Sequence, residues 1–203
     1  MRNQQDGVLT LPVEAGDHTW GPEDAPVTLV EYGDYECEWC ARAFPIVERV
    51  QQTMSQFVRV VFRHFPRNSL HPHASVAAQA AEAAAAQGKF WDMHRLLFEN
   101  QDELADVDLS RYALKLGLEV YKFQADLSSE RYAPKVQRDF DSAIQSGVKK
   151  TPTLFINGFR YEGALEYDAL AAALLSARIQ SVPPPVAEPA FRESQSCQSP
   201  QRG

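Results

Sequence analysis

The feature that most constrains the fold of this chain is a pair of cysteines, Cys37 and Cys40, at the junction of two segments with different hydrophobic patterns. Residues 27–32 form a nearly continuous apolar run, which is typical of a central strand covered on both faces. Residues 38–54 carry apolar side chains at helical spacing. The pair therefore lies where a buried strand leads into a helix.

The rest of the chain predicts a definite order of elements. A second strand at residues 57–62 completes a strand–helix–strand unit, which requires a right-handed crossover and parallel pairing. The turn Asn157-Gly158 predicts a hairpin of strands 153–156 and 159–162, followed by a last helix near residues 167–175. Residues 1–25 are predicted to be irregular, apart from a short strand near residues 8–11. Between the second strand and the hairpin, five helices are predicted at residues 74–87, 89–100, 110–116, 120–127 and 130–146.

This order predicts an α/β fold in which a mixed central sheet is flanked by helices and an all-α subdomain is inserted. We expect the core at residues 1–66 and 148–180, and the inserted helical subdomain at residues 67–147. Residues 181–203 are rich in Pro, Ser and Gln, which predicts a flexible tail.

Charge and cysteine content restrict the class of function. The formal net charge of -7 argues against nucleic acid as a partner, because phosphate binding calls for concentrated Lys and Arg. We expect no membrane insertion, since no apolar segment approaches the roughly 20 residues that span a bilayer. The N-terminus lacks the pattern of a secretory signal, so we expect a cytoplasmic location, or a periplasmic one if a signal peptide precedes this sequence.

Three cysteines in 203 residues do not make a disulfide scaffold. The close pair points instead to redox chemistry or metal binding, and Cys197 in the tail is expected to be a bystander. The position of Cys37 favours redox chemistry, because unpaired N–H groups at a helix start can lower a thiol pKa from about 8.5 to roughly 3.5–7.5. Cys37 is thus the predicted attacking sulfur and Cys40 the resolving sulfur, with substrate held in a mixed disulfide at Cys37.

A metal-binding CxxC module is the first alternative. A structural zinc site takes four ligands, and the chain has no second cysteine pair. No Asp or Glu stands at ligand spacing from the histidines, so we interpret His64, His71, His73 and His94 as structural. We predict no metal and no organic cofactor, because the two sulfurs carry the electrons.

The run Glu31-Tyr32-Gly33-Asp34-Tyr35-Glu36-Cys37-Glu38-Trp39-Cys40 resembles the active-site segment of DsbA-like thioredoxin-fold proteins. Pro45 is similar to the kink proline of their active-site helix, and Thr151-Pro152 resembles their cis-proline loop. Residues 63–74 and the helical block are similar to the bacterial, DsbA-like branch. The resemblance covers about residues 18–180 and implies a thioredoxin-like fold and a thiol–disulfide oxidoreductase activity.

The resemblance also implies roles outside the cysteine pair. It places a cis bond at Thr151–Pro152, facing the cysteines, with the backbone of Thr151 free to pair with a substrate strand. It implies that Glu31, a carboxylate in an apolar strand, has a raised pKa and accepts the proton of Cys40. The alternative for Glu31 is a strand-end glutamate that reaches solvent.

The dipeptide between the cysteines, Glu38-Trp39, leads to further expectations about the redox couple and the substrate. The Glu38 carboxylate opposes a thiolate on Cys37, which predicts a couple less oxidising than that of DsbA. Trp39 is expected to offer an apolar face to substrate. The expected substrates are protein thiols and disulfides or small thiols such as glutathione, with a further redox partner to recycle the pair. A glutathione-dependent transferase or isomerase on the same fold is the second alternative, and the direction of exchange stays open.

Overall fold

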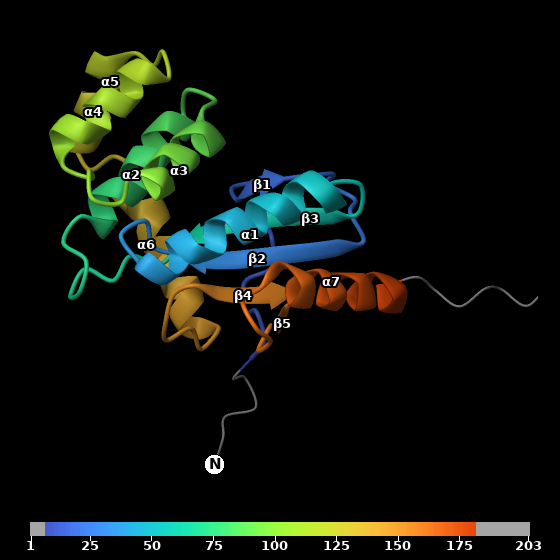
Figure 1. Ribbon diagram of the computed structural model, residues 1–203. Helices are drawn as coiled ribbons and strands as arrows, with labels where there is room; N and C mark the ends of the chain where they lie inside the picture. Colours follow the sequence, from blue (N-terminus) through green and yellow to red (C-terminus); the bar gives the residue numbers. More distant parts are fainter. Residues whose placement is uncertain (1–6, 182–203) are drawn as a thin grey trace, which may run out of the picture.

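The computed structural model describes residues 7–181 of the chain (Figure 1). Within this range the strands form one five-stranded sheet in the order β1-β3-β2-β4-β5. β2 and β3 run parallel, as the strand–helix–strand unit predicts, and the other neighbouring pairs are antiparallel. The strands are β1 (His18–Trp20), β2 (Val27–Gly33), β3 (Val58–His64), β4 (Thr153–Ile156) and β5 (Phe159–Arg160).

The helices occur where the hydrophobic patterns predict them. α1 (Glu38–Met54) joins β2 to β3 and has the predicted bounds, while α4 begins four residues before its predicted start at residue 110. The other bounds are α2 (Ala74–Ala85), α3 (Phe90–Glu99), α4 (Asp106–Lys115), α5 (Val120–Ser128), α6 (Ala133–Gln145) and α7 (Tyr167–Ser181).

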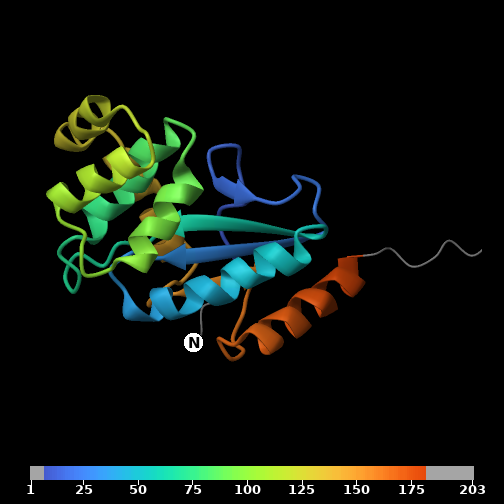
Figure 2. The ribbon, with the colours of Figure 1, turned by 45° about the horizontal axis from the view of Figure 1, so that its top comes forward.

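Alternation of side chains along the strands gives the sheet two buried faces. Val27 and Leu29 of β2 lie on the face covered by α1 and α7, whereas Val30 and Tyr32 lie on the face covered by α6. Figure 2 shows α1 and α7 together on one side of the sheet. A slip of one residue in β2 would exchange the two sets, so burial of both faces fixes the register of the sheet.

A third buried cluster joins the helical region to the cysteine pair. α2 is buried over most of its surface, and its alanines let α3 and α5 approach closely. The same cluster contains Tyr35, Cys37 and Cys40, which belong to the junction of β2 and α1. In Figure 1 this junction lies at the end of the sheet nearest to α2 and α3. The cysteine pair is therefore held between the sheet and the helical region.

The helical region also covers part of the sheet. α6 falls within the predicted insertion at residues 67–147, yet it packs on β3 through Phe140 and Ala143. One of the helices that cover the sheet thus comes from the segment predicted to form the inserted subdomain.

The prediction of irregular structure over residues 1–25 is wrong for β1. Three residues are too few to show a hydrophobic period, and β1 forms through antiparallel backbone pairing with β3. Val8, in the predicted short strand, makes an isolated bridge to Phe159. Residues 182–203, with Cys197 and nearly all of the predicted tail, lie outside the described residues.

The predicted hairpin turn is present. Asn157 and Gly158 have φ angles of 47° and 85°, which match the type I′ turn that this dipeptide favours. β5 ends at Arg160, two residues before the predicted end of the strand at residue 162.

Arg63 of β3 ties the N-terminal segment to the sheet. Its buried side chain forms a two-pronged ion pair with Asp17, with Nε–Oδ1 and Nη2–Oδ2 distances of 3.0 and 2.8 Å. The guanidinium also donates to the carbonyls of Leu11 and Pro12 and to the Tyr32 hydroxyl. Burial raises the pKa of Asp17, but the bonds from Arg63 outweigh burial, so the pKa lies below its ordinary value.

Replacing Arg63 with Met is expected to lower the free energy of unfolding by about 3–5 kcal/mol, because the Asp17 carboxylate would stay buried without its partner. The pKa of Asp17 is lowered by folding. The ion pair therefore stabilises the fold above about pH 4, and this stability is lost as the pH falls through the folded-state pKa. Urea unfolding of both proteins at pH 7 and about pH 3 measures the effect.

The matched control is Arg42→Met, because Arg42 forms an exposed ion pair with Glu38. Removing an exposed pair should cost less than about 1 kcal/mol. If Arg63→Met and Arg42→Met lost the same stability, or if the Arg63 effect were equal at both pH values, the assignment of a stabilising buried ion pair would be wrong.

Candidate active site

Cys37 and Cys40 occupy the first turn of α1. Cys37 is the N-cap residue, and its carbonyl accepts bonds from the N–H groups of Cys40 and Ala41, at 3.0 and 3.1 Å. Cys40 is completely buried, and Cys37 is 6% exposed. The more accessible sulfur thus stands at the helix start and its neighbour one turn further in, as the sequence predicts.

The surroundings of the two sulfurs give them opposite protonation states at neutral pH. A bond from the Cys40 thiol, aided by Thr151 and by backbone N–H groups of Trp39 and Cys40, outweighs burial and lowers the pKa of Cys37 to about 5. Burial raises the pKa of Cys40 well above its ordinary value, and its bond to Cys37 and the charges of Glu31 and Cys37 add to this. Both cysteines stand at the start of the same helix, one turn apart, which is the spacing of a redox-active CxxC pair.

Alkylation of the reduced protein should reveal this difference. Iodoacetamide reacts with thiolates, so its rate with Cys37 is expected to rise with pH and to reach half its maximum near pH 5. Cys40 should stay unmodified over the same pH range because its thiol is buried and protonated. Peptide mapping after timed alkylation separates the two sites, and a midpoint near pH 8.5, as for a free thiol, would show that the fold does not activate Cys37.

A groove gives access to Cys37. The groove has a volume of about 870 Å³ and is lined by Cys37 and Trp39 of α1, by Arg67, Leu70 and His71 before α2, and by residues from 149 to 165. The Thr151–Pro152 peptide bond, which lies within that last stretch, is cis. The Thr151 carbonyl oxygen lies 3.5 Å from Cys37 Sγ. The sulfur and the backbone of this loop are thus presented side by side to a molecule in the groove.

Glu31 lies in β2 and is almost fully buried, and its Oε1 has no hydrogen-bond partner among the described residues. Burial, followed by the negative charge on Cys37, raises the pKa of Glu31 to about 8. The charge of Glu31 in turn raises the pKa of Cys40, so the carboxyl and this thiol interact. A carboxyl group with a pKa near neutrality can accept and return a proton at physiological pH. The alternative in which Glu31 reaches solvent is wrong.

Glu38 and Trp39 point out of the fold. Glu38 forms an ion pair with Arg42 one turn along α1, and the Arg42 guanidinium lies 4.6 Å from the centre of the Trp39 ring. Arg42 offsets part of the Glu38 charge near Cys37, and the effect of Glu38 on the redox couple stays a prediction. Trp39 is exposed at the groove, where its ring can meet a substrate.

Asp34 is a site residue that the sequence reasoning did not single out. Its buried carboxylate accepts bonds from the N–H groups of Glu36 and Arg67, at 2.9 and 2.8 Å, and lies 2.8 Å from His71 Nδ1. Asp34 thereby fixes the loop before Cys37 to the segment that carries Arg67 and His71 into the groove. An aspartate directly after the glycine that ends β2 is the one local signal that could have suggested this role.

Gln101, after α3, supports the same loop from the helical region. Its Nε2 donates to the carbonyls of Tyr35 and Cys37, at 2.7 and 3.0 Å. A glutamine in a polar turn carries no sequence signal for this contact, which depends on how the helices lie against α1.

The histidines interpreted as structural do form structural contacts. His71 pairs with Asp34, His73 with Glu36, and the buried His94 lies 3.0 Å from the Tyr35 hydroxyl. The two carboxylate partners lie 37 positions away along the chain, so a search for carboxylates at ligand spacing does not find them, and the partner of His94 is a tyrosine 59 positions away.

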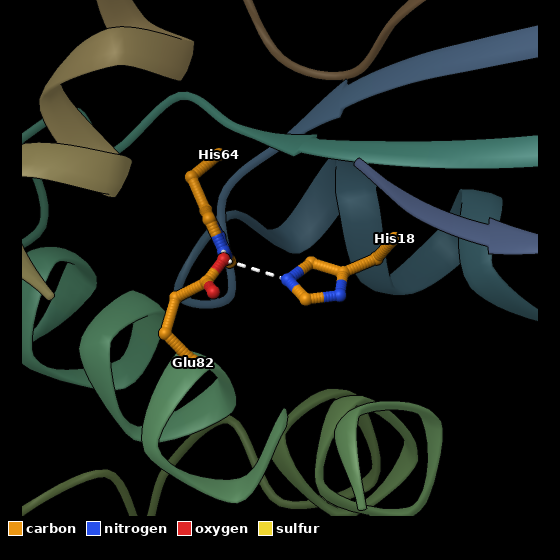
Figure 3. A group of neighbouring side chains, drawn as sticks. All are labelled: His18, His64 and Glu82. Atoms are coloured by element: carbon orange, nitrogen blue, oxygen red, sulfur yellow. Dashed lines mark hydrogen bonds and ion pairs between the residues drawn. The ribbon is translucent and has the colours of Figure 1, made fainter. Parts of the chain in front are cut away.

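His64 belongs to a separate buried cluster with His18 and Glu82, drawn in Figure 3. Nε2 of each histidine lies 2.8 Å from the same Oε1 of Glu82. Burial raises the pKa of Glu82, but the bonds from His18 and His64 outweigh burial, so the pKa lies well below its ordinary value. The cluster connects β1, β3 and α2 through one carboxylate oxygen.

Two imidazoles and a carboxylate are also ligands that zinc accepts, and the three donor atoms lie within 4.8 Å of one another. However, Lys135 Nζ lies 3.9 Å from the same Glu82 oxygen, and its positive charge opposes a second cation there. Each histidine contacts Glu82 through a hydrogen bond. Cys37 and Cys40 are not among the described side chains that form this group of metal-ligand donors.

The chain is similar to known proteins both in sequence and in fold. The sequence model of a family described as Thioredoxin matches residues 14–175. A Salinispora tropica protein named Na(+)/H(+) antiporter NhaA 3 is 47% identical over 170 residues, which is 83% of this chain and 26% of that protein. This chain therefore spans about a quarter of the length of that curated relative. No helix within residues 7–181 is long and apolar enough to cross a membrane.

Solved structures share the arrangement of strands and helices. A thioredoxin-like oxidoreductase from Silicibacter pomeroyi gives a TM-score of 0.73 at 27% identity, over 82% of this chain and 94% of that chain. Wolbachia pipientis alpha-DsbA1 gives a TM-score of 0.72 at 20% identity, over 85% and 96% of the two chains. These likenesses confirm the predicted fold class, an α/β sheet with an inserted helical region.

Proposed function

Because this chain belongs to the thioredoxin family, whose sequence model covers residues 14–175, we propose that it catalyses thiol–disulfide exchange through Cys37 and Cys40. The fold neighbours support a DsbA-like oxidoreductase in general terms. One observation carries the specific proposal: Cys37, whose pKa is lowered, and Cys40, whose pKa is raised, stand one turn apart at the start of α1, and Cys37 lines an open groove.

The proposed reaction conserves electrons between two pairs of sulfurs. The Cys37 thiolate attacks one sulfur of a substrate disulfide, the substrate S–S bond breaks, and a mixed disulfide forms as the first substrate thiolate leaves. Cys40 then loses its proton and attacks Cys37, which expels the second substrate thiolate and leaves a Cys37–Cys40 disulfide. The substrate gains two electrons and the protein pair loses two, and the reverse sequence oxidises a substrate dithiol.

Glu31 is the proposed acceptor of the Cys40 proton. In the free reduced protein, the charge on Cys37 is the second cause of the raised Glu31 pKa. That charge disappears when Cys37 bonds to substrate, so Glu31 becomes a carboxylate more readily at the stage where Cys40 must be deprotonated. Formation of the mixed disulfide thus prepares the base for the next step.

The substrate is proposed to lie along the groove, with its backbone beside Thr151 and apolar contact from Trp39. Among residues 7–181, the Thr151 N–H makes no hydrogen bond to the rest of the backbone, so it is free to pair with an added strand. The proposed substrates are protein thiols and disulfides, and a separate dithiol or glutathione returns the pair to its starting state. The antiporter name belongs to a relative of which this chain covers about a quarter. The proposed function does not rest on that name.

The test is the redox equilibrium of the pair against mixtures of reduced and oxidised glutathione, read by mass spectrometry. The Cys37 pKa of about 5 lies between the values of about 7 for thioredoxin and about 3.5 for DsbA. We therefore expect a reversible Cys37–Cys40 disulfide with a potential between about -270 and -120 mV. If no disulfide formed at any glutathione ratio, or if freshly purified protein held stoichiometric zinc on the two cysteines, the metal-binding alternative would replace the proposal.

A further inference from the structure

We propose that the groove beside Cys37 selects polypeptide segments that carry acidic residues close to their reactive cysteine. The inference rests on the proposed function and adds the class of substrate to it. It comes from the sign of the charges around the groove, which is opposite to the charge of the whole chain.

The chain carries a formal charge of -7, yet four of the side chains that line the groove are basic and one is acidic. The basic residues are Arg67, Lys149, Lys150 and Arg160, and the acidic residue is Glu162. Glu162 lies 3.9 Å from Arg160, which leaves three cations for a ligand. Within residues 7–181, no carboxylate lies within 4.0 Å of the side-chain nitrogens of Arg67, Lys149 or Lys150. Most other bases of this part of the chain do have such a partner.

The fold places these cations around the reacting sulfur. Lys149 and Lys150 directly precede Thr151, whose carbonyl oxygen lies 3.5 Å from Cys37 Sγ. Arg67 enters the groove from the segment before α2, where the buried Asp34 carboxylate holds its backbone N–H. The cations thus come from two separate segments of the chain, with Cys37 in the same groove. A substrate bound to Cys37 would meet positive charge from both segments.

The groove is large enough to take a polypeptide segment. A volume of about 870 Å³ exceeds what one or two side chains occupy, and exposed apolar surface on Trp39 and Leu70 lies beside the cations. In a strand paired with Thr151, side chains one and two positions from the substrate cysteine would lie about 3.3–6.6 Å along the groove, within reach of the lysines. Acidic side chains at those positions would complement the groove.

The size of the effect follows from the exposure of the charges. Each pair between exposed side chains contributes a factor of about 1.4 to 5 in affinity. Two or three such pairs should give about a tenfold preference for an acidic over a basic segment at low salt. The preference should shrink in 1 M salt, where the screening length falls from about 10 Å at 0.1 M to about 3 Å.

The experiment uses the full chain with Cys197→Ser, oxidised at Cys37–Cys40, and three single-cysteine peptides. The peptides are identical except for two Asp, two Asn or two Lys residues that flank the cysteine. Stopped-flow tryptophan fluorescence follows formation of the mixed disulfide, because Trp39 lies at the groove beside Cys37. Each rate is divided by the rate of the same peptide with a neutral aromatic disulfide, because flanking charges change the reactivity of the peptide thiol itself.

Two double variants separate the groove from net charge. Lys149→Glu with Lys150→Glu should reverse the order of the peptides, so that the Lys peptide becomes the fastest. Lys115→Glu with Lys122→Glu makes the same change in net charge on α4 and α5, which lie away from β4 and β5 (Figure 1), and should keep the preference for Asp. Comparing normalised rates within each variant removes any effect of a substitution on the reaction itself.

The outcomes are distinguishable. A normalised preference for the Asp peptide that is lost only in the groove variant supports the inference. Equal normalised rates for all three peptides would overturn the inference and leave the proposed function intact. The same loss of preference in both variants would also overturn it, because the whole-chain charge would then be responsible. If no peptide reacted, the proposed function itself would fail, and the inference with it.

Discussion

Replacing Cys40 with Ser is expected to give a protein that captures substrate disulfides and does not release them. Cys37 keeps its place at the N-terminus of α1 and its contact with Thr151, so it can still attack. The second step lacks its nucleophile, because an alcohol does not attack a disulfide at neutral pH. Catalytic turnover should fall to the uncatalysed rate, and a covalent complex should accumulate.

The measurement pairs a turnover assay on a peptide disulfide with non-reducing gel electrophoresis and mass mapping, in the Cys197→Ser background. Cys37→Ser is the matched control, and it should show neither turnover nor a covalent complex. A Cys40→Ser protein that kept full activity with glutathione would instead favour the transferase or isomerase alternative, whose chemistry does not need the second sulfur.

Replacing Glu31 with Gln is expected to stabilise the reduced protein and to slow its chemistry. Folding raises the pKa of Glu31 from 4.5 to about 8, so at pH 7 the folded carboxyl holds a proton that the unfolded chain has released. That difference lowers the stability of the wild-type protein by about 3 kcal/mol at pH 7, and a neutral amide of the same shape removes the cost.

The stability gained by Glu31→Gln should depend on pH. The pKa of Glu31 is higher in the folded than in the unfolded protein. The wild-type protein therefore has its full stability below the unfolded-state pKa and loses stability as the pH rises towards the folded-state pKa. The gain in Glu31→Gln should therefore be near zero at pH 4, grow between pH 4.5 and about 8, and stay constant above that range. Urea unfolding of the reduced proteins at several pH values measures it. A gain of equal size at pH 4 and pH 7 would contradict a titrating Glu31.

The loss of activity in Glu31→Gln should appear in the release step. Removing a positioned proton acceptor typically costs a factor of about 10²–10⁴, so decay of a preformed mixed disulfide should slow about a hundredfold or more. The first attack by Cys37 should change little, because Cys37 is already ionised. Glu38→Gln is the control, since Glu38 is exposed and its replacement should alter stability by less than about 0.5 kcal/mol. Equal release rates in the Glu31 variant and the wild type would remove Glu31 from the proposed mechanism.

The predictions that the structure confirms came from local patterns in the sequence. The helical spacing of residues 38–54 predicts α1 with its bounds, and the apolar run at residues 27–32 predicts a strand covered on both faces. Both patterns come from side chains a few positions apart, which one turn of helix or one strand brings to the same face. The burial of Glu31 follows in the same way, because a single carboxylate in such a strand has no exposed face to occupy.

Residues that act across the fold were not predictable in this way. β1 forms because β3 supplies its backbone partners. Glu82 is hydrogen-bonded to His18 and His64, which are 64 and 18 positions away along the chain. Arg63 reaches Asp17 across 46 positions, and Asp34 reaches His71 across 37. No period in the sequence relates such pairs, because their distance in space depends on how the sheet and helices pack.

The sequence by itself determined the chemistry at the end of the first long strand: two sulfurs one helical turn apart, the first at a helix start that stabilises negative charge. Tertiary structure alone decided what surrounds them, including the buried carboxyl near Cys40, the loop held by Asp34 and the basic lining of the groove. The physical reason is the distance along the chain over which each kind of contact is determined. Backbone geometry fixes neighbours within one turn, whereas the charge and solvent exposure of a site depend on packing between segments that the sequence leaves far apart.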